Sequence, residues 1–424
     1  MMNTFELKHT PLGRGIQFIG IGKHGSKDLP EGLVGEIMQD LRQQKADIFQ
    51  KGAFFGALRV KGVSSHEFRL EEAVGEGILS NPEALYGQLC PDSPPEMKPI
   101  GVKLLSMQTL DEQEAFVLGT YLFSNRPGEA FRGMAASILR IRYETEEEYR
   151  GLIKAAEATY TKGFQPPVSI GNKSIQLAEP FDGMEHSYLI TPLLADALQR
   201  DGYTVIAATG RSGGPKLTLN ALNLYEKLGA SFIKSTSALT NPAPGFGWAL
   251  HQRDLSPALD TWVERRHHLI KRPFLATMEK VLNPCRAQIL ITSVFHITYM
   301  EKMVELADMT GFTGVIVLKR GLEGTLAPSL ARSSGILCAA KGADGNWAFR
   351  SFDADTEEFV PFRVSEDAVI ENLSVEDNAA LVNQFANQGK TNNEDFDKRV
   401  NLGIALYRKG LTWIAGKSKG QRQS

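Results

Sequence analysis

The sequence predicts an α/β protein in two parts: an all-helical domain over residues 1–162, then a larger α/β domain over 163–424 with a mostly parallel central sheet. From about residue 31 to 162, apolar residues recur at helical spacing and β-branched runs are few. From about residue 165, short strand-like runs alternate with helical segments, as in proteins with parallel sheets. A chain of 424 residues that is 42% hydrophobic can supply the cores of both domains.

In the helical half, two segments resemble each other, at 54–73 and 135–155. Both contain a Leu-Arg pair followed by a cation, at Leu58 and Leu139, and both place an aromatic residue at one later offset. A duplicated helical unit explains the likeness. Two amphipathic helices with basic ends that resemble each other by chance explain it too. The stretch CPDSPPEMKP at 90–99 interrupts the helical pattern.

In the second half, the expected strands are TVIAA (204–208), QILITSV (288–294), GVIVLKR (314–320) and ILCAA (336–340). Helices are expected over ITPLLADALQR and ITYMEKMVELADMTG, between the strands. The stretch 346–364 predicts an edge hairpin, and a last helical region begins at about residue 377.

Charge and composition narrow the function classes. The net charge of −2 predicts no global attraction to nucleic acid, so that such binding needs a local patch. The longest apolar run, ILITSVF at 289–295, is far shorter than the roughly 18 residues of a membrane-spanning helix. The first residues lack an apolar signal core, and the three cysteines are widely spaced, which argues against a zinc site. We therefore expect a soluble, cytoplasmic protein without a cofactor.

One loop follows a predicted strand and combines three glycines with two cations. This loop lies within YTVIAATGRSGGPK at 203–216. In open α/β sheets, such loops often bind phosphate groups. The loop does not match a Walker motif, because Pro215 separates Gly214 from Lys216.

Several segments in the same order resemble the anthranilate phosphoribosyltransferase family of the nucleoside phosphorylase group, from about Gly20 to the end, with an insertion after Ala73. The segments are KGAFFGALRVKG, YLITPLLADAL, WVERRHHLIKRPFLATMEKVLNP, VFHITYMEKMVELADMTG and DNAALVNQF. The resemblance implies the fold of that group. It also implies a sugar diphosphate and magnesium as ligands, if the chain is an active transferase.

The family's ligand motifs are degraded in this sequence. Its glycine-rich diphosphate loop matches AEPFDG at 178–183, its Asn-Ile-Ser-Thr motif falls on 189–192, and its Lys-His-Gly-Asn motif falls on 208–211, where the lysine is absent. The carboxylate pair that binds magnesium is reduced to Glu323. The resemblance thus implies a relic ligand pocket of Asp182, Gly183, Thr191, Gly210, Arg266 and Glu323.

These losses make the chain more similar to the YbiB-type branch, which keeps the fold without the transferase motifs and is associated with nucleic-acid binding by a homodimer. Between residues 211 and 286, the sequence contains eleven Lys and Arg residues and five Asp and Glu residues, a local net charge of +6. The residues expected to contact nucleic acid are Arg211, Lys216, Arg265, His268, Lys271 and Arg272. A solvated helix face is the simpler explanation of the same charges.

A helix beginning at Ser256 and Pro257 organises part of this set. Its apolar residues share one face, on which Arg266 also lies, whereas positions 265, 268 and 272 are expected to face solvent. An inward Arg266 can hold a ligand or donate to backbone carbonyls. We expect a homodimer joined through residues 30–160 that binds DNA largely independently of sequence. The alternative is an active phosphoribosyl or glycosyl transferase that uses the loop at 211–216.

Overall fold

The computed structural model describes residues 4–22, 25–171, 173–214, 216–294, 296–331, 334–371 and 373–420, and these residues form two compact units. Unit 1 comprises residues 1–159, 213–215 and 261–278, and unit 2 comprises 160–212, 216–260 and 279–424, within the described ranges. The first change of unit lies close to the predicted boundary at 162. The segment 261–278, which the sequence analysis placed in the second domain, packs with unit 1.

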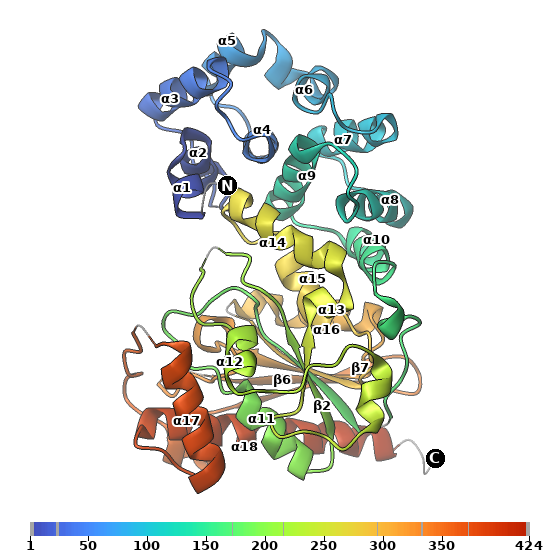
Figure 1. Ribbon diagram of the computed structural model, residues 1–424, viewed down its shortest axis with the longest axis vertical. Coiled ribbons are helices and arrows are strands. Elements are labelled where there is room, and N and C mark those ends of the chain that lie inside the picture. The colour runs from blue at the N-terminus through green and yellow to red at the C-terminus, as the bar shows by residue number, and fades with distance from the viewer. Residues whose placement is uncertain are drawn as a thin grey trace. The chain divides into compact units, whose positions relative to one another are not determined.

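Unit 1 is helical (Figure 1). Its helices are α1 (Thr4–His9), α2 (Pro11–Ile19), α3 (Glu31–Arg42), α4 (Ile48–Lys61), α5 (Glu71–Val74), α6 (Pro82–Leu89), α7 (Lys98–Leu105), α8 (Glu112–Leu122), α9 (Glu129–Arg142) and α10 (Glu146–Glu157). The first turn of helix α14 (Pro257–Leu269) belongs to unit 2 and the rest of the helix to unit 1. Helix α15 (Leu275–Val281) is also divided between the two units. The predicted helical half is therefore confirmed as helical.

Helices α4 and α9 approach each other closely because glycines line their contact. A Cβ atom on Gly52 would lie 1.8 Å from the carbonyl oxygen of Ala130, and one on Gly133 would lie 2.2 Å from the carbonyl oxygen of Phe49. No side chain larger than hydrogen fits at such distances. The two similar segments, 54–73 and 135–155, begin in these helices and continue beyond them.

The likeness of the two segments extends to their buried contacts. Glu67 is fully buried and accepts hydrogen bonds from the backbone N–H of Leu29 and of Ser64 and from the Lys61 ammonium, at 2.9, 2.8 and 2.8 Å. Glu148 is also fully buried and accepts from the corresponding groups of Leu110, Thr145 and Arg142. Each residue of the first set is separated from its counterpart by the same number of positions in the sequence. Both carboxylates thereby fix a loop against a helix in the same way.

Unit 2 is built on a seven-stranded sheet with the order β3-β2-β1-β4-β5-β6-β7. The strands are β1 (Ser174–Ala178), β2 (Thr204–Thr209), β3 (Trp248–His251), β4 (Ile289–Val294), β5 (Gly314–Lys319), β6 (Gly335–Lys341) and β7 (Trp347–Asp353). Strands β1 to β5 are mutually parallel, whereas β6 and β7 add antiparallel pairs at one edge. The predicted α/β class with a mostly parallel sheet is confirmed.

The edge hairpin differs from the prediction. Both of its strands were predicted within 346–364, but β7 pairs with the preceding strand β6. Residues Glu357–Phe362 form a 3-10 helix that contains Pro361. Proline lacks the N–H that a strand ladder needs, so the second predicted strand does not form.

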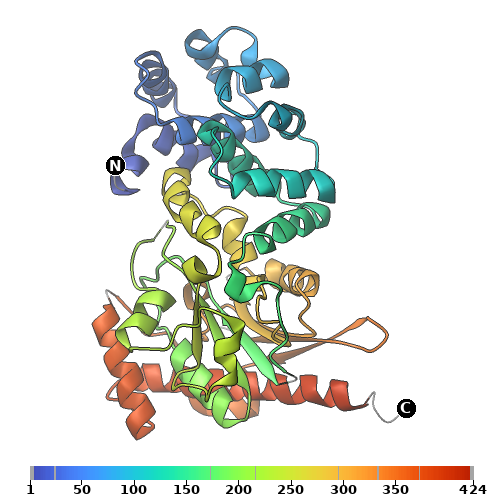
Figure 2. The ribbon, with the colours of Figure 1, turned by 45° about the vertical axis from the view of Figure 1, so that its right-hand side comes forward.

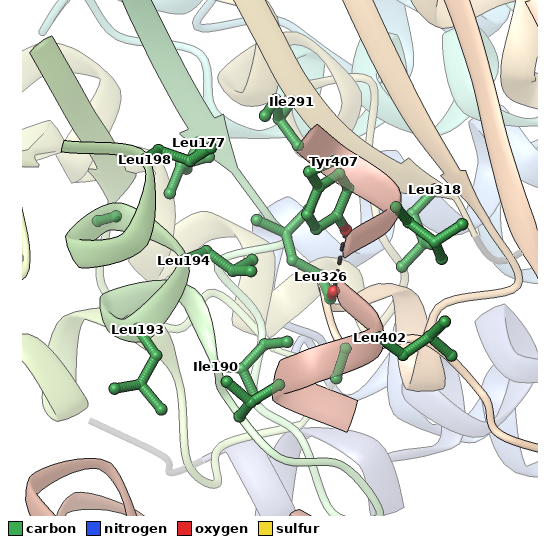
Figure 3. Packing of buried hydrophobic residues seen from close by; sticks show 14 of the residues in the cluster. Leu177, Ile190, Leu193, Leu194, Leu198, Ile291, Leu318, Leu326, Leu402 and Tyr407 are labelled. Atoms are coloured by element: carbon green, nitrogen blue, oxygen red, sulfur yellow. Dashed lines mark hydrogen bonds between the residues drawn. The ribbon is translucent and has the colours of Figure 1, made fainter. Parts of the chain in front are cut away.

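The helices of unit 2 are α11 (Thr191–Arg200), α12 (Ala221–Lys227), α13 (Gln252–Leu255), α16 (Met300–Met309), α17 (Val375–Gln388) and α18 (Glu394–Gly420). Figure 2 shows α18 as the long red helix at the base of the view. Side chains of α11 and α18 form the largest cluster of unit 2 with residues of β1, β4 and β5. At its centre, the buried Tyr407 donates a hydrogen bond of 2.9 Å to the carbonyl oxygen of Leu326 (Figure 3). This core holds the strands in register beneath the loops that follow them.

Among the residues that the structure describes, no helix combines the length and the apolar character that crossing a membrane requires.

The close contact of α4 and α9 leads to a test of helix packing. We expect Gly52→Ala to lower the free energy of unfolding by about 1–3 kcal/mol or more, because the added methyl group overlaps the backbone of α9. Gly35→Ala is the matched control, since a Cβ at Gly35 of α3 meets nothing within 4 Å. Alanine is a better helix former than glycine, so this control should be stabilised by about 0.5–1 kcal/mol. Urea unfolding of both variants measures the difference, and equal stabilities would contradict the packing described.

Candidate functional site

The parallel strands of unit 2 end at one edge of the sheet, and the loops that follow β1, β2 and β5 contact one another there. In open α/β sheets, ligands bind outside the carboxyl ends of the strands. Five of the six residues of the predicted relic pocket belong to unit 2, whereas Arg266 belongs to unit 1. The five are Asp182, Gly183, Thr191, Gly210 and Glu323.

Glu179 follows the last residue of β1 and is 1% exposed. Its Oε1 accepts a hydrogen bond of 2.5 Å from the Thr191 hydroxyl, at the start of α11, and its Oε2 accepts one of 3.2 Å from the backbone N–H of Leu326. Burial raises the pKa of Glu179 to about 7, although both hydrogen bonds act in the opposite direction. The carboxyl group thus connects the end of β1 to α11 and to the loop after β5.

The loops after β1 and β2 pack directly on each other. A Cβ on Gly210 would lie 2.4 Å from the ring of Phe181, and the side-chain amide of Asn220 donates to the carbonyl oxygens of both residues, at 3.2 and 3.0 Å. Gly183 donates its N–H to the carbonyl oxygen of Lys216 at 3.0 Å. Asp182 between them is fully buried. In this region the two loops therefore contact each other through side chains and through a backbone hydrogen bond.

Glu323 is held by three donors. Its Oε2 accepts from the backbone N–H of Glu185 at 2.7 Å and of His186 at 2.8 Å, and its Oε1 accepts from the Lys216 ammonium. Burial tends to raise the pKa of Glu323, but the hydrogen bonds from Lys216, His186 and Glu185 outweigh burial, so the pKa lies below its ordinary value. The carboxylate is therefore charged at neutral pH.

This arrangement does not fit the magnesium ion that the sequence resemblance implies for an active transferase. Hard cations bind clustered oxygen ligands, whereas N–H groups and an ammonium face Glu323. Within the described ranges, His, Cys, Asp and Glu side chains form no group of three or more that could hold a metal ion.

Arg211 is engaged within unit 2. Its guanidinium bonds to both carboxylate oxygens of Asp260, at 3.0 and 2.9 Å, and to the backbone carbonyl of Asp260 at 3.1 Å. Asp260 lies in the first turn of α14, so this pair connects the loop after β2 to that helix. Arg211 and Lys216 of the loop at 203–216 thus each have a carboxylate partner.

The face of α14 that was expected to be open to solvent is partly covered. The Arg265 guanidinium bonds to both oxygens of Glu129 at 2.8 Å, and its side chain is 15% exposed. His268 lies 3.0 Å from a carboxylate oxygen of Asp47. The expectation that position 265 faces solvent is therefore wrong, because α9 supplies an acid beside it. Leu259, Trp262, Val263 and Ile270 are buried as expected.

Arg266 is 2% exposed and lies against Gly213, where an added Cβ would be 2.5 Å from its Nε. Its inward position agrees with the helix pattern. The contact explains why a glycine stands at 213.

A different set of cations gathers beside α2 in unit 1. The Lys271 ammonium donates to the carbonyl oxygen of Gln17 at 3.4 Å, and Arg140 donates to the carbonyl oxygen of Arg272. Gln17 lines a cavity of about 560 Å³ together with Lys8, His9, Arg14, Phe18, Pro30, Gly32, Leu33 and Glu36. We call Lys8, His9, Arg14, Arg140, Lys271 and Arg272 the basic cluster.

Two cations of the basic cluster, Arg140 and Lys271, are close enough for the charge of one to affect the other. Burial, and then the charge of Arg140, lower the pKa of Lys271. Glu36 forms an ion pair with Arg14 at the rim of the cavity. Lys271 and Arg272 stand in a charge run that the sequence shows, whereas Lys8, His9, Arg14 and Arg140 lie far away in sequence and were not predicted.

No family model matches the sequence. An uncharacterized protein of Aquifex aeolicus is 24% identical over 223 residues, which are 53% of this chain and 66% of that protein, so that the match spans just under two thirds of its length. Among solved structures, the anthranilate phosphoribosyltransferase of Thermus thermophilus is similar with a TM-score of 0.51 and 17% identity, over 74% of this chain and 95% of that chain. The enzyme from Saccharomyces cerevisiae, in complex with PRPP and Mg, gives a TM-score of 0.55 and 14% identity, over 75% and 90%. The fold is thus that of the anthranilate phosphoribosyltransferases.

The buried Glu179 should make stability depend on pH. Below its ordinary pKa of 4.5 the group is protonated in both states, and between 4.5 and about 7 it ionises in the unfolded chain first. Stability should therefore fall as pH rises through this window, by up to about 3 kcal/mol at about 1.4 kcal/mol per pKa unit. Glu179→Gln should remove this component.

Urea unfolding at pH 5 and pH 8 measures the effect. We expect Glu179→Gln to be more stable relative to the wild type at pH 8 than at pH 5. Glu366→Gln, at an exposed position, is the control and should leave the pH profile unchanged. Parallel profiles for all three proteins would show that Glu179 ionises at its ordinary pKa.

Proposed function

We propose that this protein has the fold of the anthranilate phosphoribosyltransferases without their activity, and that it binds nucleic acid through the basic cluster. The observation that carries the proposal is the position of Arg140, which donates to the carbonyl oxygen of Arg272 and lies beside Lys271, whose pKa is lowered by burial and then by the charge of Arg140. Bringing like charges together is unfavourable unless an anion neutralises them. A phosphate backbone is a polyanion that neutralises several cations at once.

The loss of transferase activity is supported by the contacts at the edge of the sheet. Glu179 places a carboxyl group where the matched family motif has small residues, and Lys216 is paired with Glu323. Arg211, at the position matched to the family's Lys-His-Gly-Asn motif, is bound to Asp260. These side chains are hydrogen-bonded to one another at the positions where a transferase would need donors for a diphosphate.

The basic cluster differs in part from the residues predicted from the sequence. Arg211, Lys216, Arg265 and His268 each lie beside a carboxylate. We assign the main phosphate contacts to Lys271 and Arg272, which lie beside Arg140, together with the cations of α1, α2 and α9. Lysine and arginine contacts to phosphates position a protein without reading bases, so binding is largely independent of sequence.

We also propose that the protein is a homodimer joined through unit 1. Four large apolar side chains within residues 30–160, Ile48, Phe68, Met107 and Tyr143, are 39–47% exposed. Association would remove this surface from water. Light scattering distinguishes a dimer from a monomer of 46.6 kDa.

The affinity for nucleic acid should fall with rising salt concentration, with a slope that reflects the number of phosphate contacts. Each contact removed should reduce the slope of log affinity against log salt by about 0.9 for duplex DNA or about 0.7 for a single strand. We expect Lys271→Gln combined with Arg272→Gln to weaken binding and to remove about two such increments. Fluorescence anisotropy over a range of salt concentrations measures both quantities.

Lys390→Gln, at an exposed position in unit 2, is the matched control and should bind like the wild type. An unchanged affinity and slope in the double variant would contradict the assignment to this cluster. No binding by the wild type at low salt would end the nucleic-acid proposal itself.

Transferase activity is tested directly. Even one donor that stabilises transition-state charge is commonly worth about 10²–10³ in rate, and several are absent or paired here. We expect no consumption of fluorescent anthranilate with phosphoribosyl pyrophosphate and magnesium. An enzyme-like rate would instead favour the alternative, an active phosphoribosyl transferase.

A further inference from the structure

The contacts of Glu323 are those that proteins offer to a bound anion. Two successive backbone N–H groups, of Glu185 and His186, converge on Oε2 at 2.7 and 2.8 Å, and the Lys216 ammonium donates to Oε1. Successive backbone N–H groups form concave sites for anions, and a lysine adds a full charge. Here the anion in the site is a side chain of the protein itself.

The backbone of Glu323 is also unusual. Its φ of 53° and ψ of 17° lie in the left-handed region, inside a short 3-10 turn over Leu322–Gly324. A residue with a Cβ adopts this conformation at a cost that glycine does not have. The three donors therefore hold the side chain in place against an unfavourable backbone conformation.

The site can be reached from solvent. The side chains of Glu323, Lys216 and Glu185 are 15, 27 and 45% exposed. The Glu185 carboxylate also approaches the Lys216 ammonium, at 3.3 Å, and would reduce the affinity for a second anion. The donors at 185, 186 and 216 are not among the residues matched to the family's ligand motifs.

We propose that the N–H groups of Glu185 and His186 and the ammonium of Lys216 form an oxyanion-binding site in which Glu323 is an internal stand-in. The ligand class is a carboxylate or phosphate group of a small molecule, which takes the place of the Glu323 carboxylate. This site lies in unit 2 and is independent of the nucleic-acid proposal, which concerns residues of unit 1.

Displacement of Glu323 would affect the loop after β5. The same loop is attached through Thr325, whose hydroxyl lies 2.9 Å from that of Ser187, and through Leu326, which donates to Glu179. An anion in the site would release the attachment through Glu323 and leave those through Thr325 and Leu326. Binding would thus change the loop between residues 321 and 324 and leave the core in place.

The test removes the internal carboxylate. Glu323→Gly vacates the site and suits the left-handed backbone, so this variant should fold. We expect it to bind inorganic phosphate or acetate about tenfold or more tightly than the wild type, because a ligand no longer competes with an attached carboxylate. Calorimetric titrations with each anion at constant ionic strength measure the affinities, and their ratio identifies the preferred oxyanion.

Two further variants make the result specific. Adding Lys216→Gln to Glu323→Gly should abolish the gain, whereas Glu185→Gln alone should raise affinity much less, since Glu323 stays in place. Equal anion affinity in the wild type and in Glu323→Gly would overturn the proposal, as would a gain that survives Lys216→Gln.

If Glu323→Gly does not fold, Glu323→Gln is the second variant, because it removes the charge while keeping the size of the side chain. Glu323→Gln should show a smaller gain in anion affinity that also requires Lys216. No gain in anion affinity would again overturn the proposal. DNA binding should be unchanged in all of these variants.

Discussion

The loops at the carboxyl edge of the sheet depend on the carboxyl group of Glu179. A buried carboxyl group that lacks hydrogen bonds is strongly unfavourable, so the chain around it must supply donors. Thr191 supplies one from the first residue of α11, and Leu326 supplies one from the loop after β5. The position of Leu326 in turn restricts the turn that contains Glu323, and Lys216 meets that turn from the loop after β2.

Buried acids in unit 1 also receive hydrogen bonds from neighbouring loops. Glu67 and Glu148 are buried acids, and each binds one cation and two backbone N–H groups from a neighbouring loop. The two sets correspond position by position, and α4 and α9 meet through glycines. Buried charged groups that are fully satisfied determine loop conformation more strictly than apolar packing does.

The sequence predicts the regular parts of this fold well. The strands β2, β4 and β5 and the helices α11 and α14 lie where periodicity places them, because their apolar residues face a single core. Strand β1 was missed because it includes the buried polar residue Gln176, whose amide donates to the carbonyl oxygens of Lys280 and Leu282. No local pattern reveals partners more than a hundred residues away.

The same limit applies to the candidate site. Helical spacing correctly placed Arg266 inside, but it could not show that Glu129 covers Arg265 from another helix. The resemblance implied that Gly210 and Glu323 belong to one ligand pocket. That Phe181 lies against the first, and that three donors surround the second, follows from tertiary contacts alone.

The order in which the chain is synthesised does not match the order in which its cores are completed. Trp262, which donates to the carbonyl oxygen of Leu122, is fully buried in unit 1, yet it follows the first strands of unit 2 in the sequence. The core of unit 2 in turn needs Leu402, Leu406, Tyr407 and Leu411 of α18. On the ribosome, the emerging helices and the sheet would therefore expose apolar surface until α18 has been synthesised. Such nascent surfaces are the kind that chaperones bind.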